Sequence, residues 1–271
     1  MTPAPPATDR VNTWVVESPT SSRVAGWTAG VAGIAATAAM IATPLVPKGG
    51  QARRVLSTVV VVASFTTTTA NAARRWGLPR AGSAAATVAA GTTIIEHVGS
   101  ATGRPFGRYS YTGALRPQIA GVPAIVPLAW FSMALPAREA AHAALGPRST
   151  PVGRIALGSV AMTAWDLFLD PQMVGEGYWA WARRGFYRGI PLTNFLGWFL
   201  TGLGVMAVLE ATLPPDDGRS ADAALVGEYT LMGVMETIGF ARWFRDPVVA
   251  VAGGLGMLPI AAAAVARLTR G

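Results

Sequence analysis

The chain contains no cysteine and only two histidines, His97 and His142. Without cysteine it cannot form a disulfide, a thiolate metal site or a cysteine nucleophile. Two histidines are also too few for a histidine-rich metal centre, which excludes the membrane desaturases and hydroxylases built on such centres. We therefore expect no metal site, and we expect His142 to be solvated in a polar connection.

Charge is scarce as well. Charged residues make up 13% and apolar residues 51% of the 271 residues, whereas a typical soluble domain has roughly 25% charged residues. A membrane protein needs less charge because most of its outer surface faces hydrocarbon. We place all 22 basic residues, which give a net charge of +8, in loops or at span ends without a long basic run. This pattern predicts an integral membrane protein with no nucleic-acid partner.

Long apolar segments follow a polar N-terminal tail. About twenty apolar residues cross ~30 Å of hydrocarbon, and abundant alanine and glycine favour close helix packing. We predict an all-α membrane protein, a bundle of about eight transmembrane helices at 24–46, 55–73, 81–99, 119–135, 152–169, 191–213, 223–241 and 247–268. The number is seven if the fourth segment, broken by Pro123 and Pro127, is re-entrant. Residues 1–23 are predicted to be a disordered tail, and 24–271 a single transmembrane domain.

Two connections, 99–118 and 170–189, are rich in aromatic residues and arginine. This composition is typical of segments that lie at the level of the lipid headgroups. With eight spans, both connections lie on the same side of the membrane and together form the mouth of a cavity. The basic residues divide evenly between the two sides, so the positive-inside rule gives no orientation.

Six acidic residues fall within apolar segments or at their ends. An ionisable group in a membrane helix is costly, so each is a functional hypothesis by default. Burial without a paired cation raises the pKa of a carboxyl group, and a carboxylic acid that stays protonated near neutral pH can act as a general acid. The six are Glu96, Asp166, Asp170, Glu210, Glu228 and Glu236.

Asp166 and Asp170 are four residues apart and share one helix face. We expect Pro171 to end this helix and to set both acids at the rim of a cavity. Each acid also has a structural interpretation. In this interpretation, Asp166 forms a hydrogen bond with the backbone or with Trp165. Asp170 caps the helix or pairs with an arginine of 183–184, and the acids near span ends lie at the membrane interface.

Two stretches of the chain carry a family resemblance. The first is 96–111 (EHVGSATGRPFGRYSY), continued at 121–123 and 127–130, and the second is 163–174 (TAWDLFLDPQMV), continued at 189–198. In this order the motifs resemble the CruF-type carotenoid hydratases, a family of polytopic membrane proteins of carotenoid biosynthesis. The likeness covers roughly residues 90–205.

The resemblance implies addition of water across the terminal double bond of an acyclic carotenoid end, a 1,2-hydratase reaction that gives a tertiary alcohol. Protonation of the alkene by a carboxylic acid forms a tertiary carbocation, which negative charge or aromatic faces stabilise. This chemistry requires neither a metal nor a redox cofactor. It also implies a carotenoid substrate from the bilayer, contact with membrane lipids and with other carotenoid-pathway enzymes, and a location in a bacterial cytoplasmic membrane.

We assign candidate roles from this chemistry. Asp166 or Asp170 is the proton donor, Glu96 orients water or balances charge, and Glu236 is a further candidate acid. Candidate substrate contacts are Trp165, Trp198, Tyr109 and Tyr111, with Gln172 and Asn194 as amides that position water.

Three alternatives remain open at this point. A proton-coupled transporter fits intramembrane acids and eight spans equally well, although no matching halves are found in the sequence. A non-catalytic scaffold for other enzymes leaves the separate acids without a purpose. Among other enzymes, a carotenoid cyclase or a prenyl transferase would use similar acids, but a prenyl transferase needs two Asp-rich motifs for magnesium-bound diphosphate, and the chain has only the Asp166 and Asp170 pair.

Overall fold

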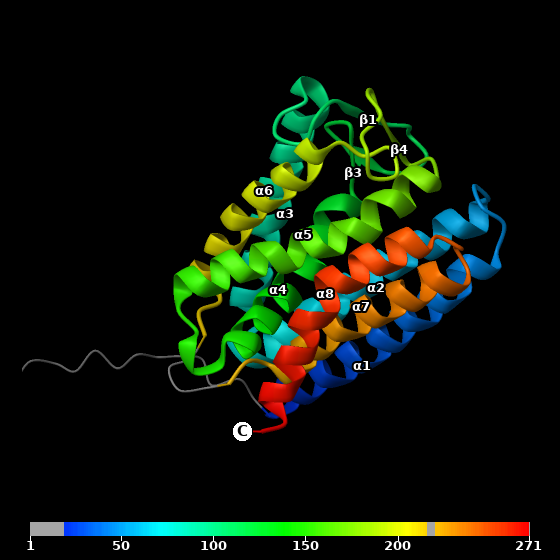
Figure 1. Ribbon diagram of the computed structural model, residues 1–271. Coiled ribbons are helices and arrows are strands. Elements are labelled where there is room, and N and C mark those ends of the chain that lie inside the picture. Colours follow the sequence, from blue (N-terminus) through cyan, green and yellow to red (C-terminus); the bar gives the residue numbers. More distant parts are fainter. Residues whose placement is uncertain (1–18, 216–219, 271) are drawn as a thin grey trace, which may run out of the picture.

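The computed structural model describes residues 19–215 and 220–270. In this part of the chain, eight helices of 20 to 26 residues form one bundle (Figure 1). They are α1 (Pro19–Ala42), α2 (Gln51–Trp76), α3 (Leu78–Thr102), α4 (Ile125–Leu145), α5 (Pro151–Gly175), α6 (Leu192–Thr212), α7 (Ala223–Arg242) and α8 (Pro247–Leu268). Short 3-10 turns follow α1 (η1, Thr43–Leu45) and α4 (η2, Gly146–Arg148).

Five of these helices, α1, α2, α5, α6 and α8, are long and apolar enough to cross a membrane. The other three helices have similar lengths and lie in the same bundle. α4 and α7 contain acidic residues, and α3 is rich in alanine and threonine. Large apolar side chains cover the outer surface, as expected where lipid is the solvent. The predicted fold class, an all-α membrane protein, is confirmed.

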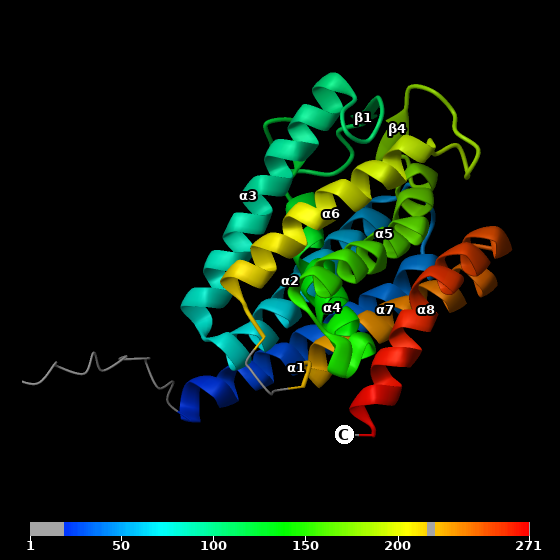
Figure 2. The ribbon, with the colours of Figure 1, turned by 60° about the vertical axis from the view of Figure 1, so that its left-hand side comes forward.

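The central helix is α4. It packs against α2, α3, α5, α6, α7 and α8, and residues 130–141 are all buried. Figure 2 shows α3 on one side of the bundle and α7 and α8 on the other, with α4 between them. A helix in this position is surrounded by protein, so it can carry charged side chains that a lipid-facing helix cannot.

The predicted boundaries of the fourth span were wrong. Residues 118–123 form a hairpin of β2 (Gln118–Ile119) and β3 (Val122–Pro123), and α4 begins only at Ile125 and runs on to Leu145. Proline lacks a backbone N–H group, but the N–H groups in the first turn of a helix have no partner within the helix. Pro127 is therefore compatible with the start of α4. Neither Pro123 nor Pro127 breaks α4, which is one continuous helix of 21 residues.

Two other predicted boundaries differ from the structure. Residues 19–23 of the predicted tail belong to α1, and the rest of that tail, 1–18, lies outside the described residues. Pro171 does not end α5, which continues to Gly175. A proline inside a helix removes one backbone hydrogen bond, and here the helix continues for another turn beyond it.

Two short strands lie at one end of the bundle (Figure 1). β1 (Tyr109–Tyr111) follows α3 and pairs antiparallel with β4 (Trp179–Trp181), which follows α5. Tyr109 lies opposite Trp181, and Tyr111 lies opposite Trp179. The two aromatic connections therefore lie on the same side, as predicted from eight spans.

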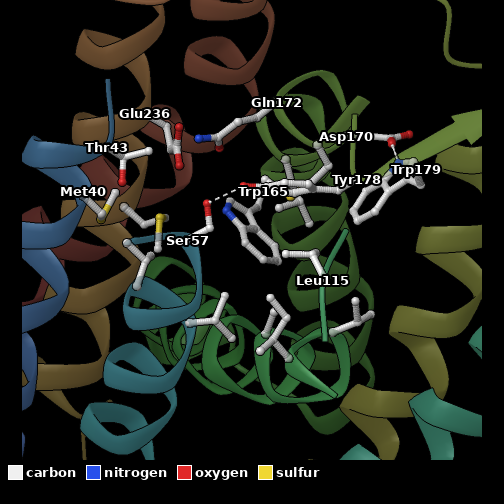
Figure 3. A pocket seen from close by; sticks show the side chains of 18 of the residues that line it. Met40, Thr43, Ser57, Leu115, Trp165, Asp170, Gln172, Tyr178, Trp179 and Glu236 are labelled. Carbon is white, nitrogen blue, oxygen red and sulfur yellow. Dashed lines mark hydrogen bonds between the residues drawn. The ribbon is translucent and has the colours of Figure 1, made fainter. Parts of the chain in front are cut away.

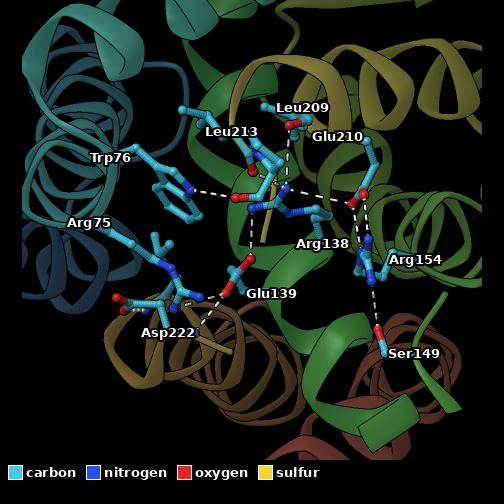
Figure 4. Close-up of polar contacts among 12 residues, drawn as sticks. Arg75, Trp76, Arg138, Glu139, Ser149, Arg154, Leu209, Glu210, Leu213 and Asp222 are labelled. Atoms are coloured by element: carbon cyan, nitrogen blue, oxygen red, sulfur yellow. Dashed lines mark hydrogen bonds and ion pairs between the residues drawn. The ribbon is translucent and has the colours of Figure 1, made fainter. Parts of the chain in front are cut away.

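The opposite end of the bundle is held together by buried charges (Figure 4). Arg138 of α4 donates to the carbonyl oxygen of Leu213 at 2.6 Å and to Oε1 of Glu139 at 2.8 Å, and its Nη1 lies 3.6 Å from Oε1 of Glu210. Arg154 of α5 binds both carboxyl oxygens of Glu210, at 2.9 and 2.7 Å. This network joins α4, α5 and α6, and Arg138 and Glu139 are completely buried.

This network corrects several sequence-based predictions. Arg138 and Arg154 were placed in a connection, whereas they are buried in α4 and α5. Glu210 was expected to be interfacial, but it is the shared partner of both arginines. His142 was expected to be solvated, but it lies in the last turn of α4 and is half-buried. The errors for Arg138 and His142 have one cause, because the fourth span was placed too early.

The Arg138 network predicts a large loss of stability for Arg138→Met. The variant leaves Glu139 and Glu210 buried without this cation, and breaking a buried ion pair in this way costs about 3–5 kcal/mol. Thermal unfolding of the purified protein in detergent measures the effect. Arg148→Met, which removes an exposed arginine from η2, is the matched control and should unfold as wild type does. Equal unfolding temperatures for the two variants would contradict the prediction.

Candidate active site

A largely apolar cavity of about 370 Å³ lies at the end of the bundle that carries β1 and β4. This size falls within the range of ligand pockets in proteins, roughly 300–1,000 Å³. Its walls come from α1 to α7, from η1 and from the two aromatic connections. Three carboxyl groups face it, those of Glu96, Asp170 and Glu236.

Glu96 lies near the end of α3 and accepts hydrogen bonds from three aromatic side chains. Its Oε2 accepts from the hydroxyl groups of Tyr109 and Tyr111, the latter at 2.8 Å, and its Oε1 accepts from the indole Nε1 of Trp130 at 3.1 Å. All three donors are neutral, and Glu96 itself is buried. An ionised carboxylate can only accept hydrogen bonds, so a set of three donors suits the ionised form of this side chain.

The tyrosines are fixed as donors by their surroundings. Both lie in β1, outside the helices, and burial together with the negative charge of Glu96 raises the pKa of Tyr109 and the pKa of Tyr111 above the ordinary value of 10.0. Neither hydroxyl therefore ionises near neutral pH. Glu96 keeps two O–H donors under all physiological conditions.

Asp166 and Asp170 are joined through the amide of Asn194. The Nδ2 atom of Asn194, in the first turn of α6, donates to Oδ2 of Asp166 at 2.7 Å and to Oδ2 of Asp170 at 2.9 Å. Trp179 Nε1 donates to the other oxygen of Asp170 at 2.5 Å. In the described structure Oδ1 of Asp166 has no hydrogen-bond partner. One amide group therefore holds two carboxyl groups without a cation.

Only one member of this pair faces the cavity. Asp170 lines the cavity, whereas Asp166 is fully buried and lies outside the set of lining residues. The difference follows from their spacing, because Asp170 is one helical turn nearer the end of α5. Asp166 is therefore the inner and Asp170 the outer carboxyl of the pair.

Tryptophan rings form a wall beside these acids. Trp130 of α4 and Trp198 of α6 stack with their ring centroids 4.0 Å apart, and Trp165 of α5 meets Trp198 edge to face at 6.0 Å. All three rings line the cavity. Their π faces and edges are suited to contact with an apolar or cationic group.

Phe106 fixes the connection between α3 and β1. Its ring is buried between α3 and α6 at two glycines, Gly99 and Gly197. A Cβ atom at Gly99 would lie 2.8 Å from this ring, and one at Gly197 would lie 2.7 Å from it, both too close for a real contact. The two glycines thus let the connection enter the bundle and bring Tyr109 and Tyr111 to Glu96.

A second group of polar side chains lies on the other side of the cavity (Figure 3). Glu236 lies near Thr43 and Gln172, away from Asp170 and Trp179. The hydroxyl groups of Ser57 and Tyr178 lie between, 3.1 Å apart. In the described part of the chain, no hydrogen bond or ion pair is found for the Glu236 carboxyl group.

The structure brings most of the predicted site residues to one cavity. Nine of the ten line it, and the tenth, Asp166, lies directly behind Asn194. Asn194 holds the two aspartates. Asp170 contacts Trp179 and Asn194, not the predicted arginine of 183–184.

The prediction missed Trp130, Trp179 and Trp181. Trp130 belongs to a motif that carries the family resemblance, and it donates to Glu96. Trp179 and Trp181 lie in an aromatic connection that was predicted to lie at headgroup level and to help form the mouth of a cavity, and both side chains line the cavity. Because side chains alternate along a strand, Trp179 and Trp181 point to the same face of β4.

The fold and this site together define a class of protein, a helical membrane protein with carboxyl groups in the wall of a mostly apolar cavity. The family model described as carotenoid biosynthesis protein matches residues 50–264. The chain therefore belongs to the carotenoid biosynthesis protein family, and the resemblance to CruF-type carotenoid hydratases is confirmed.

One curated relative supports a finer comparison. The chain is 38% identical over 111 residues to bisanhydrobacterioruberin hydratase of Haloarcula japonica (strain ATCC 49778 / DSM 6131 / JCM 7785 / NBRC 101032 / NCIMB 13157 / TR-1). This match covers 40% of the chain and 37% of the relative. The similarity thus spans little more than a third of the relative's length. No solved structure matches the chain.

The tyrosines of β1 predict how stability depends on pH. Since folding raises the pKa of Tyr109 and of Tyr111, their contribution is fully present below pH 10.0, the ordinary value, and is lost as the pH rises through their folded-state values. The unfolding temperature should fall between about pH 9 and pH 11, and less steeply in a Tyr109→Phe, Tyr111→Phe double variant. Thermal unfolding across this range measures both slopes. Identical slopes would contradict the assignment.

Proposed function

We propose that this protein is a carotenoid hydratase that adds water to the terminal C=C bond of an acyclic carotenoid end. The observation that carries this proposal is the pairing of β1 with β4. Tyr111 and its partner Trp179 lie side by side, and they donate to Glu96 and to Asp170, respectively. Two acids from different helices are thus held at one apolar cavity, which is what protonation of an alkene in a dry site requires.

The proton comes from Asp170 in this proposal. Its carboxyl group gives the proton to the CH carbon of the terminal double bond, and the π electrons form the new C–H bond. The neighbouring carbon, which carries two methyl groups, becomes a tertiary carbocation. Asp166 shares the amide of Asn194 with Asp170, and a pair of carboxyl groups held by one neutral amide is suited to carry one proton between them.

Glu96 and the tryptophans stabilise the carbocation in this proposal. Glu96 accepts hydrogen bonds from three neutral donors, which favour its ionised form, and a fixed charge in a water-excluded site acts strongly on developing charge. The faces of Trp165 and Trp198 add cation–π attraction. A water molecule then attacks the cation, and its surplus proton returns to the aspartate pair. The net change is addition of one water molecule.

The transporter alternative receives less support. A transporter must open its binding site to each side of the membrane in turn. The cavity lies at one end of the bundle, and the other end is held by the buried network of Arg138, Glu139, Glu210 and Arg154. Family membership likewise favours an enzyme of carotenoid biosynthesis, and we place it in a bacterial cytoplasmic membrane.

Labelled water tests the reaction directly. In cells that accumulate lycopene or a monocyclic carotene and are grown in oxygen-labelled water, the protein should yield a carotenoid heavier by one labelled water. In deuterated water, deuterium should also appear on the carbon next to the new alcohol. Mass spectrometry of the extracted carotenoids measures both. An unchanged carotenoid in cells shown to contain the protein would overturn the proposal for these substrates.

Single amide variants rank the acids. Asp170→Asn should lower the rate of hydration about 100-fold or more, because it removes the general acid. Asp166→Asn and Glu96→Gln should each lower it, by weakening the proton pair or the stabilising charge. Glu236→Gln tests whether the fourth predicted acid takes part.

The matched control for these variants is Glu228→Gln. Glu228 lies on α7 outside the cavity lining, where Thr68 and Asn71 donate to its carboxyl group. The rate of product formation per amount of folded protein is the measurement. Full activity in Asp166→Asn, Asp170→Asn and Glu96→Gln would show that the assignment of acid catalysis is wrong.

A further inference from the structure

The cavity wall contains residues that are also exposed on the outside of the bundle. Ile41, in the last turn of α1, is 52% exposed, and Ile238, in the last turns of α7, is 48% exposed. Trp243, just after α7, is 49% exposed. All three line the cavity. A residue that faces both the cavity and the surroundings lies at an opening.

The packing of the helices explains why an opening lies here. α1 packs along α2, and α7 packs along α8. α2 makes some contact with α7, whereas α1 and α7 make at most weak contact in the described part of the chain. The residues of these two helices that line the cavity and are also exposed lie near the C-terminal ends of α1 and α7.

We propose that the cavity opens sideways to the bilayer between the C-terminal ends of α1 and α7, and that a long apolar polyene enters there end first. The nature of this ligand rests on the proposed function. The side chains inside the opening include three flexible apolar ones, Met40 from α1 and Met232 and Met235 from α7. Methionine adapts its shape to an apolar partner, which suits the passage of a chain.

The position of the opening agrees with a reaction at the end of the substrate. Met40 of α1 and Glu236 of α7 lie on one side of the cavity, and Asp170 lies on the other (Figure 3). Only the terminal part of a chain needs to reach Asp170. The remainder stays in hydrocarbon, so the protein need not desolvate the whole polyene.

A cysteine experiment tests the opening, because the chain contains no cysteine of its own. Ile41→Cys and Ile238→Cys are each labelled with a bulky maleimide in the membrane. The matched controls are Ile34→Cys on α1 and Leu231→Cys on α7. Each control lies seven residues earlier on the same helix face, is exposed, at 73% and 45%, and does not line the cavity.

Uptake of lycopene from loaded vesicles into the purified protein is the first measurement, by the polyene absorbance that remains bound after size exclusion. Labelling at position 41 or 238 should lower the rate of uptake about tenfold or more, whereas labelling at 34 or 231 should leave it unchanged. Equal uptake in all labelled variants, or no uptake by the unlabelled protein, would overturn the proposed opening.

The second measurement is water addition by the same samples. If labels at 41 and 238 block uptake and the unlabelled protein hydrates the polyene, both proposals are supported. If these labels block uptake but the unlabelled protein binds the polyene without adding water, the opening is supported and the hydratase proposal fails. The two failures are thus distinguishable.

Discussion

The antiparallel pairing of β1 with β4 is the interaction on which the arrangement of this cavity depends. It joins connections that follow α3 and α5, and it sets Tyr111 beside Trp179 with their ring centroids 5.9 Å apart. Each ring carries one donor to a different acid. Without this pairing Glu96 would keep only Trp130, and Asp170 only Asn194, as a neutral donor, and a buried polar group that lacks partners is costly. The other end of the bundle meets the same constraint differently, because Arg138 and Arg154 neutralise Glu139 and Glu210 there.

Much of this fold follows from hydropathy alone. Low charge and long apolar segments predict an all-α membrane bundle, and six of the eight helices begin within four residues or so of their predicted starts because leucine, valine and alanine runs mark them clearly. The exceptions have physical reasons. α4 is surrounded by other helices, so it carries an arginine and a glutamate that hydropathy reads as a loop, and α1 begins earlier, at Pro19, because polar residues continue its helix at the membrane edge. The acids of the site were also predictable, since unpaired carboxyl groups in apolar segments are rare and costly.

The partners of these acids were not predictable in the same way. Whether Asp170 meets an arginine or a tryptophan depends on the path of the connection after α5, and short strands of three residues leave almost no periodic signal. Asn194 lies 28 residues from Asp166, and only the crossing of α5 and α6 decides that its amide reaches both aspartates. Phe106 is a similar case. Its position between Gly99 and Gly197 depends on the approach of α3 to α6, which no local pattern encodes.

The shared amide of Asn194 has a consequence for how the chain is assembled in the membrane. Asp166 and Asp170 lie on α5, but their common donor lies on the next helix. If α5 enters hydrocarbon alone, both carboxyl groups lack that donor, and each unsatisfied polar group in lipid is expensive. The hairpin of α5 and α6 is the smallest unit in which both aspartates have their amide partner. Biosynthesis of this protein should therefore favour insertion of these two helices as a pair.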